Sequence, residues 1–339
     1  MVTAHWRKAP PSRIQTSDYK NNGTTPFLAQ IIMIKLIKSL IPKAIKDYVK
    51  YAIAKLYLKS SYAAARAIGN VDSGWRARID DVISSPDNAE IERCATAGEL
   101  DGYTITMHNG VRVCANGYYG AGILNLLVEN RGVHEPQEER AFEQIIRLLP
   151  NECVMLELGA YWGFYSLSLL QQRSKAKCFL VEPSSANLFS GKLNFRLNKR
   201  QGDFTQAYVD RSPKEYPKTI SVDSFCKEHK IEHLNLLHSD IQGYELSMLE
   251  GATSLLTKGD VDFVFISTHS PELHSDCITK LKSFGYIILA DADMNETFSL
   301  DGLIVAKHQS VEEPQAIEIS KKKAHQDGAT GRGYLKWST

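Results

Sequence analysis

The sequence predicts an α/β fold built on a doubly wound, mostly parallel sheet. From residue 152 onward, short apolar runs alternate with segments of helical spacing, which is typical of parallel strands joined by crossover helices. The predicted strands cover residues 153–158, 177–182, 204–209, 234–240, 261–268, 286–290 and 302–306. The predicted helices between them cover residues 162–173, 184–198, 223–228, 245–256 and 272–284. Only a loop separates the last two strands, which predicts that they run antiparallel to each other.

Composition and cysteine usage exclude several classes of protein. The chain has 339 residues, of which 43% are hydrophobic and 23% are charged, and these values exclude wholesale disorder, a collagen-like chain and a coiled coil. No apolar run reaches the length of about 18 residues that a membrane-spanning helix needs. The cysteines are Cys94, Cys114, Cys153, Cys178, Cys226 and Cys277. They form no CxxC pair, which excludes a zinc knuckle or a small disulfide scaffold and predicts a cytoplasmic, reducing environment.

The excess positive charge of the chain lies in its N-terminal part. Residues 1–60 contain eleven Lys or Arg and two Asp, a balance of +9 in a chain whose net charge is +1. We expect residues 1–26 to be disordered and residues 27–68 to form basic amphipathic helices, with Met33 as a candidate second start. These helices fit a solvated surface of the domain or, through residues 27–59, peripheral contact with an anionic membrane. They lack the interleaved Arg and aromatic residues that favour base stacking, so no nucleic-acid partner is expected.

Residues 69–150 are predicted to form an accessory, or cap, region that contains a β-hairpin. Its strands, 103–107 and 111–114, are joined by His108-Asn109-Gly110, and Asn-Gly is a strong hairpin signal. A helix over 136–148 has Pro in its first turn, acids early and Arg late, which complements the helix dipole. At the other end of the chain, the polar and basic residues 308–339 are expected to form a disordered tail.

A glycine turn after the first predicted strand indicates a nucleoside ligand. Gly159 and Gly163 permit a sharp turn from strand to helix, but Tyr161 occupies the position of the middle glycine in a dinucleotide fingerprint. This disfavours a nucleotide-dependent oxidoreductase, which stays open as an alternative. Glu157 precedes the turn, and Glu182 ends the next strand, where an acid accepts hydrogen bonds from a ribose diol. An adenosine ligand with an amino-acid portion and no pyrophosphate is S-adenosylmethionine. The alternative for Glu182 is a surface carboxylate.

Three side chains at two further strand ends are candidates for acid–base chemistry. His238 and Asp240 are two positions apart on a strand and are therefore expected to share a face, with His269 at the end of the next strand. We expect Asp240 to position the transferred methyl group or the acceptor hydroxyl, and His238 to take the acceptor proton. A packed histidine is the alternative for His238. The three groups also suit a divalent metal, but their spacing matches no known metal motif, so an acid–base role for His269 is favoured and no metal is predicted.

Three segments together resemble the FkbM family of S-adenosylmethionine-dependent methyltransferases. They are VMLELGAYWGFYS (154–166), LVEPSSANLFSGKLNFRLN (180–198) and ISVDSFCKEHKIEHLNLLHSDIQGYELSMLEGA (220–252). The resemblance implies a class I methyltransferase fold of seven strands, the last antiparallel, in a cofactor-binding domain over residues 151–307. It implies methyl transfer to a hydroxyl of a sugar, glycan, glycolipid or polyketide-type acceptor.

Individual residues at the strand ends are expected to hold the cofactor. The expected cofactor-binding residues are Glu157, Gly159, Ala160, Tyr161, Gly163, Glu182 and Asp240. Two positions depart from the family pattern: His238 stands where the family usually has Lys, and Gln242 replaces its first Glu after the Asp. A membrane- or partner-binding scaffold on a methyltransferase fold is the non-enzymatic alternative.

Overall fold

The computed structural model describes residues 71–322 continuously, and before them residues 45, 56, 59–61, 63–66, 68 and 69. The chain divides into two units, residues 1–55 and 56–339. The predictions for residues 1–26, for Met33 and for most of the basic segment 27–68 therefore lie outside the described residues, as does the end of the predicted tail. Within the described part, no helix is long and apolar enough to span a bilayer.

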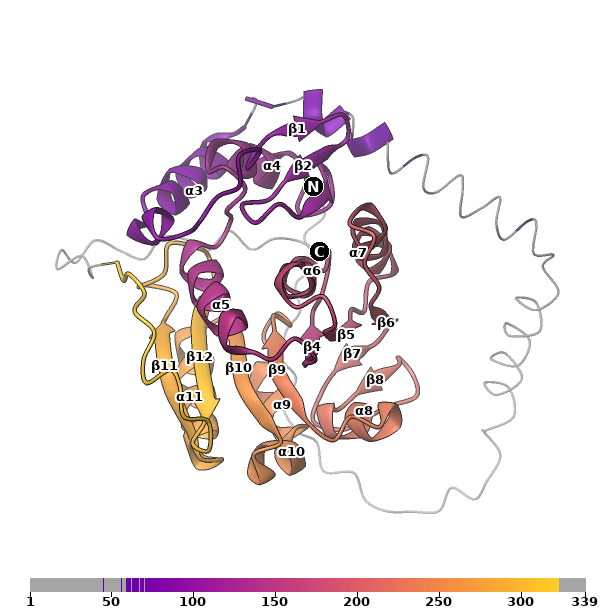
Figure 1. Cartoon of the computed structure of the whole chain (residues 1–339), viewed down its shortest axis with the longest axis vertical. Helices are drawn as coiled ribbons and strands as arrows, with labels where there is room; N and C mark the ends of the chain where they lie inside the picture. The colour runs from indigo at the N-terminus through magenta and orange to yellow at the C-terminus, as the bar shows by residue number, and fades with distance from the viewer. Residues whose placement is uncertain are drawn as a thin grey trace, which may run out of the picture. The chain divides into compact units, whose positions relative to one another are not determined.

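A seven-stranded sheet forms the centre of the second unit (Figure 1). Its strands, in spatial order, are β11 (Tyr286–Ala292), β12 (Gly302–His308), β10 (Val261–Thr268), β9 (Leu234–Ser239), β4 (Val154–Leu158), β5 (Lys177–Val181) and β6 (Asp203–Thr205). Neighbouring strands from β10 to β6 pair in parallel, whereas β12 pairs antiparallel with both β10 and β11. This confirms the predicted seven strands and the antiparallel last strand.

Both faces of the sheet are covered, as the doubly wound prediction requires. Successive side chains of β10 alternate between two cores, because Phe263 and Phe265 pack in one cluster and Val264 and Ile266 in the other. The first cluster receives the helices α5 (Pro136–Leu148), α6 (Phe164–Gln172) and α7 (Ser185–Leu197). The second receives α8 (Val222–His229), α9 (Glu245–Glu250), α10 (Thr253–Lys258) and α11 (Pro271–Ser283).

Two predicted elements are divided in the structure. The predicted strand 204–209 leaves the main sheet after β6, and β7 (Tyr208–Val209) pairs instead with β8 (Thr219–Ile220), where Val209 and Ile220 bury their side chains against the second core. The predicted helix 245–256 is interrupted between α9 and α10. Gly251 lies against the carbonyl oxygen of Asp210, which a Cβ would approach to 2.7 Å, and the Gly251 carbonyl accepts the N–H of Asp223. The tertiary contact therefore ends the first helix.

The N-terminal extension consists of α3 (Ser73–Ile83), the short 3₁₀ helix η1 (Pro86–Ala89), β1 (Leu100–Asp101), the hairpin β2 (Thr104–Thr106) and β3 (Arg112–Cys114), and α4 (Ala121–Glu129). The predicted hairpin is confirmed, although its turn spans three residues and only Gly110 of them has positive φ. Asn194 of α7 and Asn198 directly after it attach the hairpin to this helix, because their side-chain oxygens accept the N–H groups of Cys114 and Arg112, respectively. The free edge of β3 is therefore paired with side chains.

The described part of the predicted tail is ordered by packing. Ile317 is only 4% exposed, and its N–H donates to the carbonyl of Leu289 on the edge strand β11. The N–H of Ser320 donates to the carboxylate of the buried Asp87. The prediction of disorder from residue 308 is therefore wrong for residues 309–322, because the open edge of the sheet and a buried acid both supply partners that the polar composition does not indicate.

Substitution of Gly159 tests the close contact between its backbone and the carbonyl oxygen of Asp240. A Cβ there would lie 1.7 Å from the carbonyl oxygen of Asp240, whereas Gly243, which also has positive φ, has no atom within 4 Å of its Cβ position. We expect Gly243→Ala to lower the free energy of unfolding by roughly 1 kcal/mol through backbone strain alone. Gly159→Ala should lower it by at least about 2 kcal/mol more, because the backbone must move. Urea denaturation measures both, and equal losses would contradict the predicted contact.

Candidate active site

The predicted glycine turn joins the ends of three strands. The N–H groups of Gly159 and Ala160 both donate to the carbonyl of Val181 at the end of β5. The N–H of Asp240, just after β9, donates to Leu158, and its carbonyl faces Gly159. The carboxyl ends of β4, β5 and β9 therefore meet at this turn, which is where ligands bind in open α/β sheets.

Glu157, at the end of β4, stabilises the turn through hydrogen bonds with α6. Its side chain is 3% exposed, and its Oε2 accepts hydrogen bonds from both the backbone N–H and the hydroxyl of Ser166 in α6. Burial raises the pKa of Glu157, an effect that the charge of His238 and the bonds from Ser166 oppose. Because its carboxylate is engaged with the first turns of α6, Glu157 holds strand and helix together.

Glu182 lies at the end of β5 and faces the turn. Its Oε2 accepts the N–H of Tyr161 at 3.2 Å, and its Oε1 accepts the N–H of Ser184 at 2.8 Å and the Asn187 amide at 3.3 Å. A carboxylate offers about four acceptor sites, so Oε2 can accept one more donor. Gly163, with φ of +71°, then starts α6, and its absent Cβ would lie 2.9 Å from the Phe195 ring.

His269 is clamped among three carboxyl groups. Its Nδ1 lies 2.9 Å from Glu245, and its Nε2 lies 3.3 Å from Asp240 and 3.5 Å from Asp301. Burial alone would lower the pKa of His269, but the hydrogen bonds with Asp240 and Glu245 outweigh it and raise the pKa to about 11. His269 is therefore an imidazolium at neutral pH. In this form His269 does not accept a proton, and its acid–base role stays a prediction.

His238 does not share the open face with Asp240. It is 3% exposed, its ring lies 4.2 Å from that of Tyr165, and its Nε2 lies 2.7 Å from Glu138 of α5. Burial lowers the pKa of His238, but the hydrogen bond and charge of Glu138 outweigh this and raise it. The structure thus packs His238 against α5, as the alternative expected, although only Nε2 has a hydrogen-bond partner, and a role as proton acceptor stays a prediction. Asp240 does not share its face because β9 ends at Ser239, so strand alternation no longer orients that residue.

Acids at the start of α5 were missed by the sequence reasoning. Glu138 contacts His238 and also accepts the hydroxyl of Ser267, and Glu135 Oε2 accepts the hydroxyl of Tyr165 at 2.8 Å. The signal was the run Glu135-Pro-Gln-Glu-Glu, which was explained by the helix dipole alone. The helix dipole does not account for their burial, since the first four residues of α5 are all buried against the strand ends. Asp301, directly before β12, carried no sequence signal beyond a Gly neighbour.

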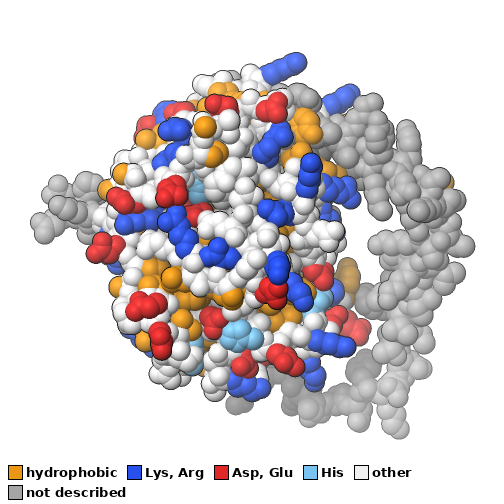
Figure 2. Space-filling view, viewed as in Figure 1, with side chains coloured by type: hydrophobic (Ala, Val, Ile, Leu, Met, Phe, Trp, Pro, Cys, Tyr) orange, Lys and Arg blue, Asp and Glu red, His pale blue; other side chains and the backbone are white. Residues whose placement is uncertain are grey.

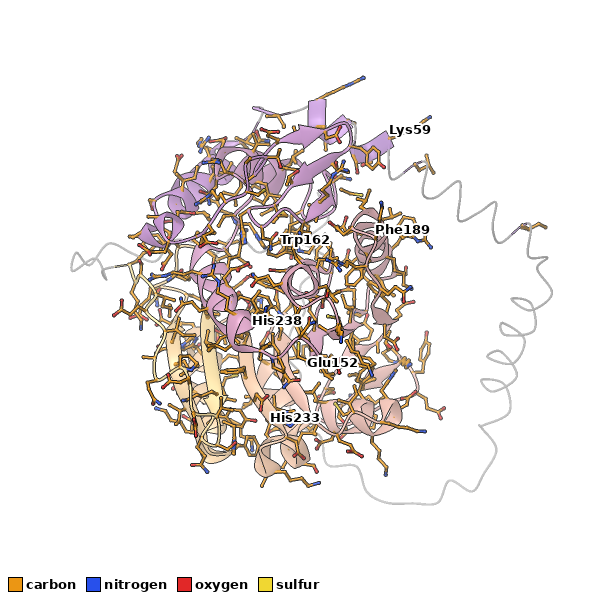
Figure 3. The ribbon with its side chains drawn as sticks, viewed as in Figure 1. Lys59, Glu152, Trp162, Phe189, His233 and His238 are labelled. Carbon is orange, nitrogen blue, oxygen red and sulfur yellow. The ribbon has the colours of Figure 1, made fainter. Side chains whose placement is uncertain are left out.

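Aromatic side chains of the N-terminal extension line the other side of the site. Tyr118 stacks on Trp162 with ring centroids 4.6 Å apart and planes at 8°, and Tyr119 lies 5.3 Å from Tyr161. Tyr119 is 46% exposed, whereas Tyr118 is partly buried, and burial raises the pKa of both hydroxyls. Figure 3 shows Trp162 toward the extension, with Glu152 and His233 at the opposite end of the sheet. The extension therefore contributes directly to the site.

Two grooves lie away from these residues. One, of about 410 Å³, runs between Arg140, Asp291 and residues 317–321, and the other, of about 300 Å³, lies beside Lys177 and residues 229–233 at the amino ends of the strands. Within the described ranges, no three His, Cys, Asp or Glu side chains are grouped so as to hold a metal ion.

Comparison with known proteins supports the assignment of this chain. The family model of the Methyltransferase FkbM domain matches residues 166–288. This segment therefore matches the family that the sequence motifs resemble. The 2-O-methyltransferase NoeI of Sinorhizobium fredii is 25% identical over 42% of this chain and 75% of its own length.

Two solved structures are similar over about half of this chain. The methyltransferase FkbM from Methylobacillus flagellatus is 17% identical, with a TM-score of 0.40, over 48% of this chain and 45% of that one. TrmK of M. capricolum, in complex with S-adenosyl-homocysteine, is 14% identical, with a TM-score of 0.36, over 50% of this chain and 68% of that one. This chain therefore spans less than half of the Methylobacillus protein.

The two departures from the FkbM pattern lie on opposite sides of Asp240. His238 is withdrawn between α5 and the sheet, while Gln242 adopts positive φ and its amide donates to the Asp240 carboxylate at 3.1 Å. The segment matched by the family contains Glu182, Asp240 and His269. The glycine turn precedes it and Asp301 follows it.

The pH dependence of stability tests the burial of Glu135. Burial raises the pKa of Glu135 from 4.5 to about 7, although the charge of His134 opposes this. A carboxyl whose pKa rises on folding stabilises the folded state below its unfolded pKa, and that contribution is lost as the pH rises through about 7. Glu135→Gln cannot ionise. Relative to this variant, the wild type should lose roughly 2 kcal/mol or more of unfolding free energy between pH 4.5 and 8.

Chemical denaturation across this pH range measures the difference. Glu152→Gln is the matched control, because Glu152 lies at the exposed opposite end of β4 with a side chain 75% exposed. A constant difference between wild type and Glu135→Gln over the whole range would show that Glu135 titrates normally.

Proposed function

We propose that this chain is an S-adenosylmethionine-dependent O-methyltransferase. The observation that carries the proposal is the position of Asp240, whose backbone touches the glycine turn while its carboxylate lies 3.3 Å from the His269 imidazole. A donor bound at the turn and an acceptor hydroxyl at Asp240 would then be neighbours. Such proximity is the main requirement of a transfer in which the cofactor supplies the leaving group.

The residues of the turn fit the proposed methyl donor. Gly159, Ala160, Tyr161 and Gly163 would surround its amino-acid portion. The remaining acceptor site on Glu182 suits a ribose hydroxyl. Bound S-adenosylmethionine supplies an activated methyl group on a positively charged sulfur.

The chain's own task is to align the acceptor and remove its proton. Neither histidine serves as the base in this proposal, since His269 is a cation and His238 is buried in contact with Glu138. Asp240 accepts a hydrogen bond from the acceptor hydroxyl and takes its proton as the new O–CH₃ bond forms. The imidazolium of His269 and the amide of Gln242 orient that carboxylate.

The walls of the site favour a polyhydroxylated acceptor such as a sugar, a glycan or glycolipid, or a polyketide. Carboxylates at the strand ends accept hydrogen bonds from hydroxyls, and the exposed ring of Tyr119 offers an apolar face for a sugar ring. The relative NoeI is named a 2-O-methyltransferase, which supports oxygen as the acceptor atom.

Calorimetry with S-adenosylmethionine and S-adenosylhomocysteine tests the cofactor. We expect micromolar binding that Glu182→Ala weakens at least tenfold, about 1.4 kcal/mol, because the ribose loses its acceptor. Glu182→Gln retains one carbonyl oxygen and should weaken binding less, while Glu152→Gln should have no effect. A folded wild-type protein that binds neither ligand would remove the proposal and favour the scaffold alternative.

Transfer of a ¹³C-labelled methyl group tests the chemistry. With a panel of sugars, glycolipids and polyketides as acceptors, we expect a labelled product whose carbon shift is that of an O-methyl ether. Asp240→Asn should lower turnover by roughly two to four orders of magnitude, the range of general acid–base catalysis. Its affinity for S-adenosylhomocysteine should change less than about threefold, since ribose contact is kept. Undiminished turnover would exclude Asp240 as the proton acceptor.

A further inference from the structure

Two carboxylates lie close to the same imidazole nitrogen at the centre of the site. The Nε2 of His269 lies 3.3 Å from Asp240 and 3.5 Å from Asp301, while its Nδ1 is engaged by Glu245. One N–H group has one hydrogen to donate. Asp240 and Asp301 therefore cannot both be neutralised by this imidazolium, and negative charge is left over between them.

The surrounding elements do not remove that charge. The charge of Arg78 in α3 lowers the pKa of Asp301, but this effect is smaller than the opposite effect of Asp240. Glu138, from α5, adds a further negative charge, and Glu135 beside Tyr165 adds another when it is ionised.

The raised pKa of Asp301 agrees with this excess of negative charge. Burial raises the pKa of Asp301 to about 6, and the negative charge of Asp240 adds to the effect, while His269 and Arg78 oppose it. Outside the site, side chains of both charges are interspersed over the face in Figure 2.

This acidic pair borders the place proposed for the methyl donor. Asp240 touches Gly159 through its backbone, and Asp301 directly precedes Gly302, which pairs with Thr268 at the carboxyl end of β10. Both acids therefore lie at the same edge of the sheet as the glycine turn. Their side chains are 24% and 23% exposed, so a ligand can reach them.

We propose that Asp240 and Asp301, bridged by His269, form an anionic subsite for the positively charged sulfur of the methyl donor. The inference rests on the proposed function and deepens it. S-adenosylhomocysteine lacks the methyl group and the positive charge, so the subsite attracts the donor and not the product. The acidic pair thereby favours exchange of spent cofactor for fresh cofactor, and Asp301 is its specificity-determining residue.

Calorimetry on the full chain with both ligands tests this inference. We expect the wild type to bind S-adenosylmethionine at least five times more tightly than S-adenosylhomocysteine at pH 7.5. Asp301→Asn, which keeps the shape of the side chain, should weaken the charged ligand about fivefold or more and the neutral one less than twofold. Asp293→Asn is the matched control from the same loop, where Asp293 caps a turn through the N–H groups of Asn295 and Glu296.

Proton release provides a second measurement that needs no variant. A positive ligand beside Asp301 favours its ionised form, so binding of S-adenosylmethionine near pH 6 should release part of a proton. The apparent binding enthalpy will then depend on the ionisation enthalpy of the buffer, and binding of S-adenosylhomocysteine should show less of this dependence. The affinity ratio of the two ligands should also fall as the pH is lowered below about 6.

The outcomes separate the two proposals. Equal wild-type affinities for the two ligands, or a ratio that neither Asp301→Asn nor low pH changes, overturn the anionic subsite and leave the methyltransferase proposal standing. Failure of the folded wild type to bind either ligand removes both. If Asp301→Asn does not fold, the pH dependence of the wild-type ratio decides.

Discussion

The close approach of Gly159 to the carbonyl of Asp240 is the contact on which the site depends. It brings the turn after β4 against the end of β9 with no space for a side chain between them. The same turn donates two hydrogen bonds to the end of β5. Because the three strand ends are joined through backbone, the carboxylates of Glu182 and Asp240 are carried on a rigid frame, which is the preorganisation that group transfer requires.

The site concentrates groups that would be unfavourable elsewhere. Glu135 and Asp301 are carboxyl groups whose pKa values burial raises to about 7 and about 6, and His269 is a partly buried cation. Burying charge lowers stability unless each charge has a partner, and here the partners are shared. Perturbed titration of this kind gathers at functional sites, since a group tuned near neutrality can both hold and exchange a proton.

Parts of the chain outside the segment matched by the family complete the site. Gln137 of α5 donates to the carbonyl of Ser320 and accepts the N–H of Phe298, so one side chain ties the C-terminal segment and the loop that leads to Asp301 to the helix that carries Glu135. On the other side, Tyr118 stacks on Trp162 of the glycine turn. The extension and the C-terminal segment therefore shape the face that an acceptor would meet, and differences in these parts can alter specificity while the sheet stays the same.

The sequence by itself determined the layers of the fold and the strand ends that bear the site. Strand–helix alternation, the glycine turn and the acid at the end of β5 are local patterns of burial and backbone freedom, and such patterns are written in neighbouring residues. Tertiary structure alone decided which acids and histidines face one another. His238 is buried in contact with Glu138, the acid in α5. His269 is a cation because the carboxylates of Glu245 and Asp240 both lie close to its ring nitrogens. Asp301 contacts His269 although it lies 32 residues further along the chain. Charge state depends on distance and desolvation between distant segments, and no local pattern contains either quantity.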